Sequence, residues 1–168
     1  MGKVIDTERL TLRHFEAGDA DFIVRLLNDP SFIRHIADKQ VRTREHAVHY
    51  LENGPMASYR AHGFGLNLVQ LKGEGTPIGM CGLVKRDELD RPDLGYAFLP
   101  AFCGRGYAFE AAAAVLEQGM TAHALYSVLA VTLPDNARSN RLLTTLGFRA
   151  KGAVDLYGAR NNLYEYCR

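Results

Sequence analysis

The chain is short of several features that define other protein classes: it has no tryptophan, few cysteines, no excess of either charge and no long apolar run. Its three cysteines, Cys81, Cys103 and Cys167, fit no disulfide framework and no metal or redox spacing, which predicts free thiols in a reducing cytoplasm. Twenty basic and 19 acidic side chains give a net charge of +1, so no nucleic-acid partner is expected without a local basic patch.

Segments that would cross or enter a membrane are also missing. The most apolar helical stretch, 108–122, is interrupted by two glutamates and is too short to span a bilayer. The N-terminal residues lack the apolar core of a signal peptide, and Asp6 stands where N-myristoylation needs Ser or Thr. With no repeat, linker or low-complexity segment, the sequence predicts one cytoplasmic globular domain over residues 1–168 and no membrane partner.

The hydrophobic periodicity predicts strands and helices in mixed order. Strands are expected at 10–15, 64–71, 77–85, 93–99, 126–133, 148–156 and 162–167. Helices are expected from Gly18, over 31–37, after Thr43, and over 56–62, 107–123 and 137–146. The three strands between 64 and 99 are expected to form an antiparallel meander, and the apolar strand at 126–133 should be buried on both faces. This order is typical of the α/β (α+β) class.

A glycine pair marks the first candidate site. Gly104 and Gly106 directly precede the helix at 107–123, where backbone N–H groups lack helical partners and the helix dipole is positive. That combination suits a phosphate or pyrophosphate, although two glycines before a helix can also form an ordinary tight turn. A P-loop is excluded because no Gly-Lys-Ser/Thr follows, and the dinucleotide pattern fails because Phe109 replaces its third glycine.

The second candidate site lies at the start of the helix at 137–146. Asn136 and Ser139 are three residues apart, so they share one face of the first helical turn. The alternative is simple capping, with Asn136 as the N-cap and the leucines of this helix in the core.

These segments together resemble the GCN5-related N-acetyltransferase (GNAT) superfamily. Residues 100–111 look like its acyl-CoA pyrophosphate loop, and Asn136–Asn140 followed by Leu146-Gly147-Phe148 looks like its second motif. The opening Thr7-Glu8-Arg9-Leu10-Thr11-Leu12-Arg13 is similar to the start of the branch that includes the ribosomal-protein N-terminal acetyltransferases. The resemblance runs from about Thr7 to Cys167.

The resemblance implies a GNAT-like fold: a central mixed, mostly antiparallel sheet of six to seven strands, flanked by four to five helices and splayed between 93–99 and 126–133. It also implies acetyl-CoA as cosubstrate, bound in that slot without a metal. The pantetheine amides would pair with the strand edge near Phe98 and Leu99, and the pyrophosphate would sit on the N–H groups from Cys103 to Ala108. The full set of implied cofactor-binding residues is Phe98, Leu99, Cys103, Gly104, Arg105, Gly106, Tyr107, Ala108, Asn136, Ser139, Asn140 and Arg141.

The implied chemistry is direct attack of a neutral amine on the thioester. A strand N–H near Leu99 would stabilise the oxyanion, and Ser139, at the matching family position, would protonate the departing thiolate. Asn136 would hold the pantetheine arm or the acceptor side. Asp93 could act as a general base through water, or could simply be a solvated strand-end residue. Asp155 is a second candidate base, and no base is needed if the amine arrives neutral.

Two departures from the family pattern affect the site. Ala101 and Cys103 replace residues that often assist the phosphate, which could shift that role to Arg105 and Arg141. Lys151 begins a Lys-Gly pair where many relatives carry Glu-Gly, which leaves the acceptor preference open. An acyl-cysteine mechanism at Cys103 would need a positioned histidine that no nearby sequence supplies.

The prediction is therefore an acetyl-CoA-dependent N-acetyltransferase that forms a ternary complex. Its acceptor would be a primary amine, either a peptide or protein N-terminus or a small molecule, with residues 30–63 forming much of an acceptor lid. The alternative is a CoA-binding sensor or partner-binding domain without turnover. His46 and His49 lack a third metal ligand. Relatives are often monomers or homodimers, and the sequence favours neither.

Overall fold

The structure is a computed structural model that describes residues 2–168, built on one sheet of eight strands in the order β1-β2-β3-β4-β5-β6-β8-β7. The strands are β1 (Lys3–Asp6), β2 (Leu10–His14), β3 (Leu66–Leu71), β4 (Pro77–Val84), β5 (Asp93–Phe98), β6 (Ser127–Thr132), β7 (Arg149–Leu156) and β8 (Ala159–Cys167). The α-helices are α1 (Ala20–Leu27), α2 (Pro30–His35), α3 (Arg44–Asn53), α4 (Pro55–His62), α5 (Tyr107–Ala122) and α6 (Ala137–Leu146). Two short 3₁₀ turns, η1 (Ala17–Asp19) and η2 (Pro100–Phe102), join them.

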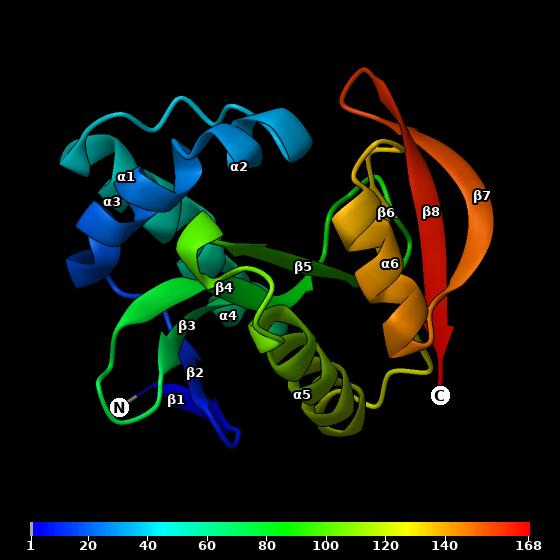
Figure 1. Cartoon of the computed structure of the whole chain (residues 1–168), viewed down its shortest axis with the longest axis horizontal. Helices are drawn as coiled ribbons and strands as arrows, with labels where there is room; N and C mark the ends of the chain where they lie inside the picture. Colours follow the sequence, from blue (N-terminus) through cyan, green and yellow to red (C-terminus); the bar gives the residue numbers. More distant parts are fainter. Residues whose placement is uncertain (1) are drawn as a thin grey trace.

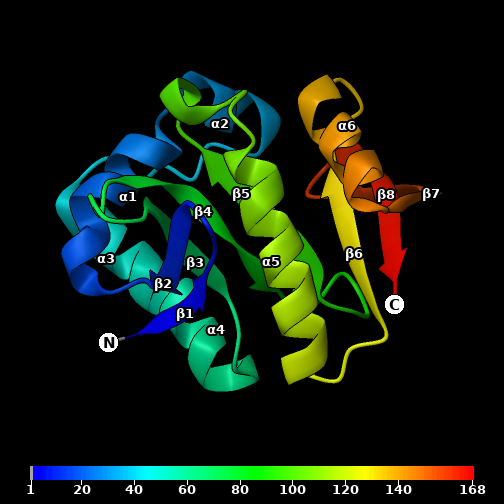
Figure 2. The ribbon, with the colours of Figure 1, turned by 60° about the horizontal axis from the view of Figure 1, so that its bottom comes forward.

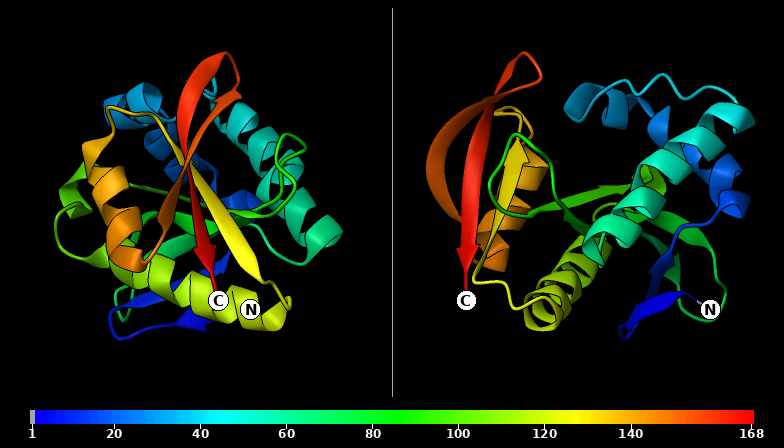
Figure 3. Two further views of the ribbon diagram at one scale, coloured as in Figure 1. Left: turned by 90° about the vertical axis from the view of Figure 1, so that its right-hand side faces the viewer. Right: turned by 180° about the vertical axis from the view of Figure 1, so that it is seen from behind.

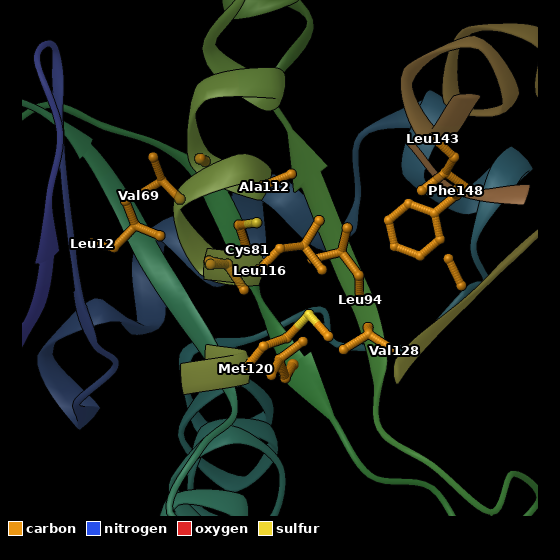
Figure 4. Packing of buried hydrophobic residues seen from close by; sticks show 14 of the residues in the cluster. Leu12, Val69, Cys81, Leu94, Ala112, Leu116, Met120, Val128, Leu143 and Phe148 are labelled. Atoms are coloured by element: carbon orange, nitrogen blue, oxygen red, sulfur yellow. The ribbon is translucent and has the colours of Figure 1, made fainter. Parts of the chain in front are cut away.

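The helices divide between the two faces of the sheet, and each face has its own core. Helices α1 to α4 cover one face (Figure 3). Side chains such as Ile23, Leu51 and Ala97 pack together there. Helices α5 and α6 lie on the other face (Figure 2). There Leu94 of β5, Leu116 of α5 and neighbouring apolar side chains fill the space between the elements (Figure 4).

The sheet is interrupted between β5 and β6, which are its parallel neighbours. They pair at a single position, Asp93 with Leu129, whereas β4 and β5 pair along their whole length. Beyond Asp93 the two strands diverge, so that β6, β8 and β7 stand apart from β1 to β5 (Figure 1). The sheet is therefore joined at the start of β5 and open at its end, as the predicted splay requires.

The expected fold class is confirmed, and the structure adds detail at the N-terminus. The sheet has eight strands rather than six to seven because Lys3–Asp6 forms an additional edge strand, β1, antiparallel to β2. This strand is short and half-exposed, so it has no apolar alternation by which the sequence could reveal it. The meander β3-β4-β5 and the burial of β6 agree with the sequence predictions.

Candidate active site

The glycine loop lies at the open end of β5, between η2 and α5. Gly104 and Gly106 have φ angles of +77° and +84°, a left-handed conformation that glycine adopts without strain. A Cβ atom added at Gly104 would meet nothing within 4 Å, so the loop backbone is open to a ligand.

The loop also presents unpaired backbone donors. In the described residues, the N–H groups from Gly104 to Phe109 have no hydrogen-bond partner, whereas the N–H of Cys103 donates to the Pro100 carbonyl over 3.1 Å. Cys103 therefore does not belong to the predicted set of free amides, because its N–H closes the 3₁₀ turn. The remaining donors lie at the start of a 16-residue helix, where the helix dipole is positive, so their arrangement suits an anion.

The backbone N–H groups that β5 leaves free toward the slot differ by one residue from those that the sequence predicted. The Leu99 N–H donates to the Ile78 carbonyl over 2.9 Å, so it faces β4 and cannot stabilise an oxyanion in the slot. Because N–H groups along a strand alternate in direction, those of Tyr96 and Phe98 face the side where β6 has diverged. Phe98 thus keeps its predicted position, and Leu99 packs in the core on the face of α1 to α4.

Ser139 forms a hydroxyl pair with a residue that the sequence prediction missed. The Asn136 side chain caps α6 by accepting a hydrogen bond from the Ser139 N–H over 3.3 Å. Ser139 itself is 8% exposed, and its Oγ hydrogen-bonds the Tyr96 hydroxyl of β5. Burial raises the pKa of Tyr96 to about 12, although the bond to Ser139 opposes this shift, so the phenol stays protonated at neutral pH. The sequence contained one indication of this position: strand alternation puts Tyr96 on the same face of β5 as Leu94 and Phe98.

Asn140 is occupied by structural hydrogen bonds. Its Oδ1 accepts from Thr132 Oγ1 over 2.5 Å and from the Tyr164 hydroxyl over 3.0 Å, while its Nδ2 donates to the Pro134 carbonyl over 3.2 Å. These bonds tie α6 to β6 and β8. Its role in cofactor binding stays a prediction, and in the structure its side-chain amide makes these hydrogen bonds instead.

The predicted basic residues sit at the surface beside the slot. Arg141 is exposed on the first half of α6, and Arg105 is exposed in the glycine loop with its guanidinium 5.9 Å from the Phe102 ring centroid. Tyr107 and Ala108, which open α5, are partly buried.

Asp93 lies at the opposite, closed end. Its side chain is 1% exposed, and its two carboxylate oxygens accept from Arg86 Nε over 3.0 Å and Arg86 Nη2 over 2.8 Å. Burial raises the pKa of Asp93, and the Arg86 guanidinium opposes that shift. Asp93 is thus not the solvated strand-end residue of the alternative reading, and its role as a base stays a prediction. Asp155 is exposed and pairs with Arg160 over 3.2 Å.

In the described part of the chain, no group of three or more His, Cys, Asp or Glu side chains could hold a metal ion. The Cys103 thiol points back to the Leu99 carbonyl, 3.6 Å away. Among residues 2–168, no helix combines the length and apolarity that crossing a membrane requires.

Comparison with known proteins places this geometry in a family. The acetyltransferase (GNAT) domain family matches residues 9–149. The uncharacterised N-acetyltransferase YnaD of Bacillus subtilis (strain 168) is 30% identical over 148 residues, covering 88% of this chain and 84% of the relative.

Solved structures share the fold. A GNAT-family acetyltransferase from Bacillus anthracis has a TM-score of 0.81 at 25% identity, covering 97% of both chains. RimL, a ribosomal L7/L12 alpha-N-protein acetyltransferase solved with coenzyme A, has a TM-score of 0.84 at 15% identity, covering 98% of this chain and 97% of its own. On the strength of the domain match and the splayed sheet, the chain belongs to the GNAT acetyltransferase family.

Proposed function

We propose that the protein transfers the acetyl group of acetyl-CoA to a primary amine by direct attack in a ternary complex. The observation that carries this proposal is the row of unpaired N–H groups from Gly104 to Phe109 at the open end of the slot. Any helix start leaves N–H groups such as those of Tyr107 to Phe109 unpaired, and the loop adds those of Gly104, Arg105 and Gly106 beside them. A pyrophosphate is an anion of the right size and charge for this extended row.

The residues along the slot fit the rest of an acyl-CoA. The pyrophosphate would accept hydrogen bonds from the amides of Gly104 to Ala108, and the pantetheine amides would pair with the β5 edge at Tyr96 and Phe98. RimL, which shares the fold, was solved with coenzyme A. Bound in this way, acetyl-CoA supplies the reactive thioester.

The chain's own groups then serve the acyl transfer. The Phe98 N–H would stabilise the oxyanion in place of the Leu99 N–H, which is bonded to Ile78. Ser139 would give its proton to the thiolate as the carbon–sulfur bond breaks, and Tyr96 would replace that proton through their hydrogen bond. The amine would lose its proton to water, and water would return a proton to Tyr96, so that the hydroxyl pair is restored after each turnover. Holding both substrates in the slot would supply much of the rate.

The acceptor would approach from the face of α1 to α4, opposite to α5 and α6. Residues 30–63 form α2 to α4 on that face, where a hollow of about 320 Å³ is lined by Lys39, His46, His49, Tyr50 and neighbours. Arg34 of α2 lies 3.7 Å from Asp135, which precedes α6, and this contact supports a lid position beside the slot. Both acceptor classes, a peptide N-terminus and a small-molecule amine, remain proposals.

A thiol-release assay with acetyl-CoA and a panel of amines and N-terminal peptides tests the function. Amine-dependent release in the wild type, about ten- to hundred-fold slower in Ser139→Ala, is the expected result. Binding of acetyl-CoA without release for any amine would favour the CoA-binding sensor. No binding at all would overturn the proposal.

A further inference from the structure

The N-terminal arm, which comprises β1, β2 and the turn between them (residues 3–14), contacts the start of α5 through one carboxylate. Glu110, in the first turn of α5, accepts hydrogen bonds from Thr7 Oγ1 over 2.5 Å, from the Arg9 N–H over 2.9 Å and from Arg9 Nε over 2.7 Å. Partial burial would raise the pKa of Glu110, but these bonds outweigh it and hold the pKa below 4.5. A residue more than a hundred positions away in the chain is thereby fixed to the helix that carries the anion site.

Arg9 also holds the glycine loop itself. Its Nη1 donates to the Arg105 carbonyl over 3.0 Å, and its guanidinium lies 4.5 Å from the centroid of the Tyr107 ring. Its Nη2 is so close to Gly106 that an added Cβ would stand 3.2 Å from it. One guanidinium therefore contacts Glu110, Arg105, Gly106 and Tyr107 together.

The bond to Arg105 has a geometric consequence for the anion site. In a trans peptide the C=O of one residue and the N–H of the next point in opposite directions. By drawing the Arg105 carbonyl toward itself, Arg9 turns the Gly106 N–H outward and keeps a carbonyl dipole away from the ligand. The loop glycines would otherwise be free to rotate this peptide plane.

We propose that Arg9 is a positioning residue for the pyrophosphate loop, which it presets through the Arg105 carbonyl and anchors through Glu110. The inference rests on the proposed function, because it assumes an acyl-CoA pyrophosphate at this loop. This role accounts for the position of the Thr7-Glu8-Arg9 segment beside the loop. Neither the sequence motifs nor the fold alone assigns such a role to Arg9.

The test compares Arg9→Lys with Arg13→Lys. Both arginines belong to the same arm and pair with a carboxylate, Arg9 with Glu110 and Arg13 with Asp19 over 2.8 Å. Lysine keeps the charge but lacks the planar fork needed to hold Glu110 and the Arg105 carbonyl at once. Arg9→Lys should raise the KM for acetyl-CoA roughly ten-fold, the effect of about one lost charged hydrogen bond, with kcat nearly unchanged.

Acetyl-pantetheine, which lacks the pyrophosphate, separates positioning from general destabilisation. Its KM should be the same for Arg9→Lys and the wild type, and Arg13→Lys should leave both KM values unchanged. Equal increases with both donors, or an unchanged KM for acetyl-CoA in Arg9→Lys, would overturn the inference while leaving the proposed function intact. Failure of the wild type to bind acetyl-CoA would instead remove the proposed function and the inference with it.

Discussion

The two ends of the gap between β5 and β6 are built from different interactions. At the closed end, Arg91 of the β4–β5 connection joins the two parts of the sheet, since it donates to Ser127 Oγ of β6 over 2.6 Å and also contacts Glu165 of β8. Beside it, Arg86 pairs with the buried Asp93. At the open end no ion pair joins β5 to α6 in the described residues. The link there is the hydroxyl pair of Tyr96 and Ser139.

This difference separates stability from ligand binding along one strand. Ion pairs with a buried partner fix geometry but leave no group free for a substrate, since their oxygens and nitrogens are already paired. The open end keeps its N–H groups unpaired and its hydroxyls neutral. Substitutions at the closed end should therefore affect the folded state, and substitutions at the open end should affect the reaction.

The largest effect is expected in the glycine loop. Gly104→Asp would place a carboxylate in the anion site, so the KM for acetyl-CoA should rise by about a hundred-fold or more through charge repulsion and loss of the anion-binding geometry. Kinetics at varied acetyl-CoA concentration measure this. Gly73→Asp is the matched control, because Gly73 also has a positive φ and empty surroundings but lies in the β3–β4 turn. An equal loss in both variants would contradict the assignment of the loop.

The next effect is on stability, at the closed end. Asp93→Asn should lower the free energy of unfolding by about 3 kcal/mol, because it leaves the half-buried Arg86 guanidinium without its counter-charge. Denaturant titration measures this loss, and kcat measured at a temperature where the variant is folded should stay near the wild-type value. A stable variant with a much lower kcat would instead support Asp93 as the general base.

A smaller effect is expected for the hydroxyl pair. Ser139→Ala should lower kcat by about ten- to hundred-fold without raising the KM for acetyl-CoA, because the proton donor to the thiolate is lost. Tyr96→Phe should lower it less, since Ser139 remains. Thr145→Ala, at an exposed position further along α6, serves as the control. Wild-type turnover in Ser139→Ala at every pH tested would exclude the proposed donor.

The smallest effect concerns pH at the N-terminal arm. The pKa of Glu110 lies below its ordinary value of 4.5 in the folded protein, so its contribution to stability is present above that value and is lost as the pH falls through the lower folded pKa. Glu110→Gln should melt about 3 °C or less below the wild type at pH 7. The difference should shrink as the pH falls below 4.5 through the lower folded pKa, and a difference that stayed constant over the acid range in which both proteins are folded would contradict the assigned pKa direction.

The features that the sequence predicted depend on neighbours close along the chain. The turn at Gly104 and Gly106 and the cap at Asn136 follow from local backbone chemistry, and periodicity located nearly all strands and helices. The edge strand Lys3–Asp6 was missed because only its backbone pairing with β2 makes it a strand, and its residues show no alternation of apolar and polar side chains.

The features that the sequence could not predict depend on contacts across the fold. Tyr96 meets Ser139 only because β5 and α6 approach each other, and Arg9 meets Glu110 across a separation of 101 residues. The burial of Asp93 depends on Arg86 folding back from the β4–β5 connection. The choice between Phe98 and Leu99 as the free amide depends on the register of β5 against β4, which a single strand sequence does not contain.

Calorimetric titration of acetyl-CoA into the wild type and into a Gly104→Asp/Gly106→Asp double variant tests whether the glycine loop binds the acyl-CoA pyrophosphate. We expect binding in the micromolar range for the wild type and none for the double variant, with both proteins folded. Absence of binding by the wild type, or equal binding by the folded double variant, would contradict the assignment of the glycine loop as the acyl-CoA site.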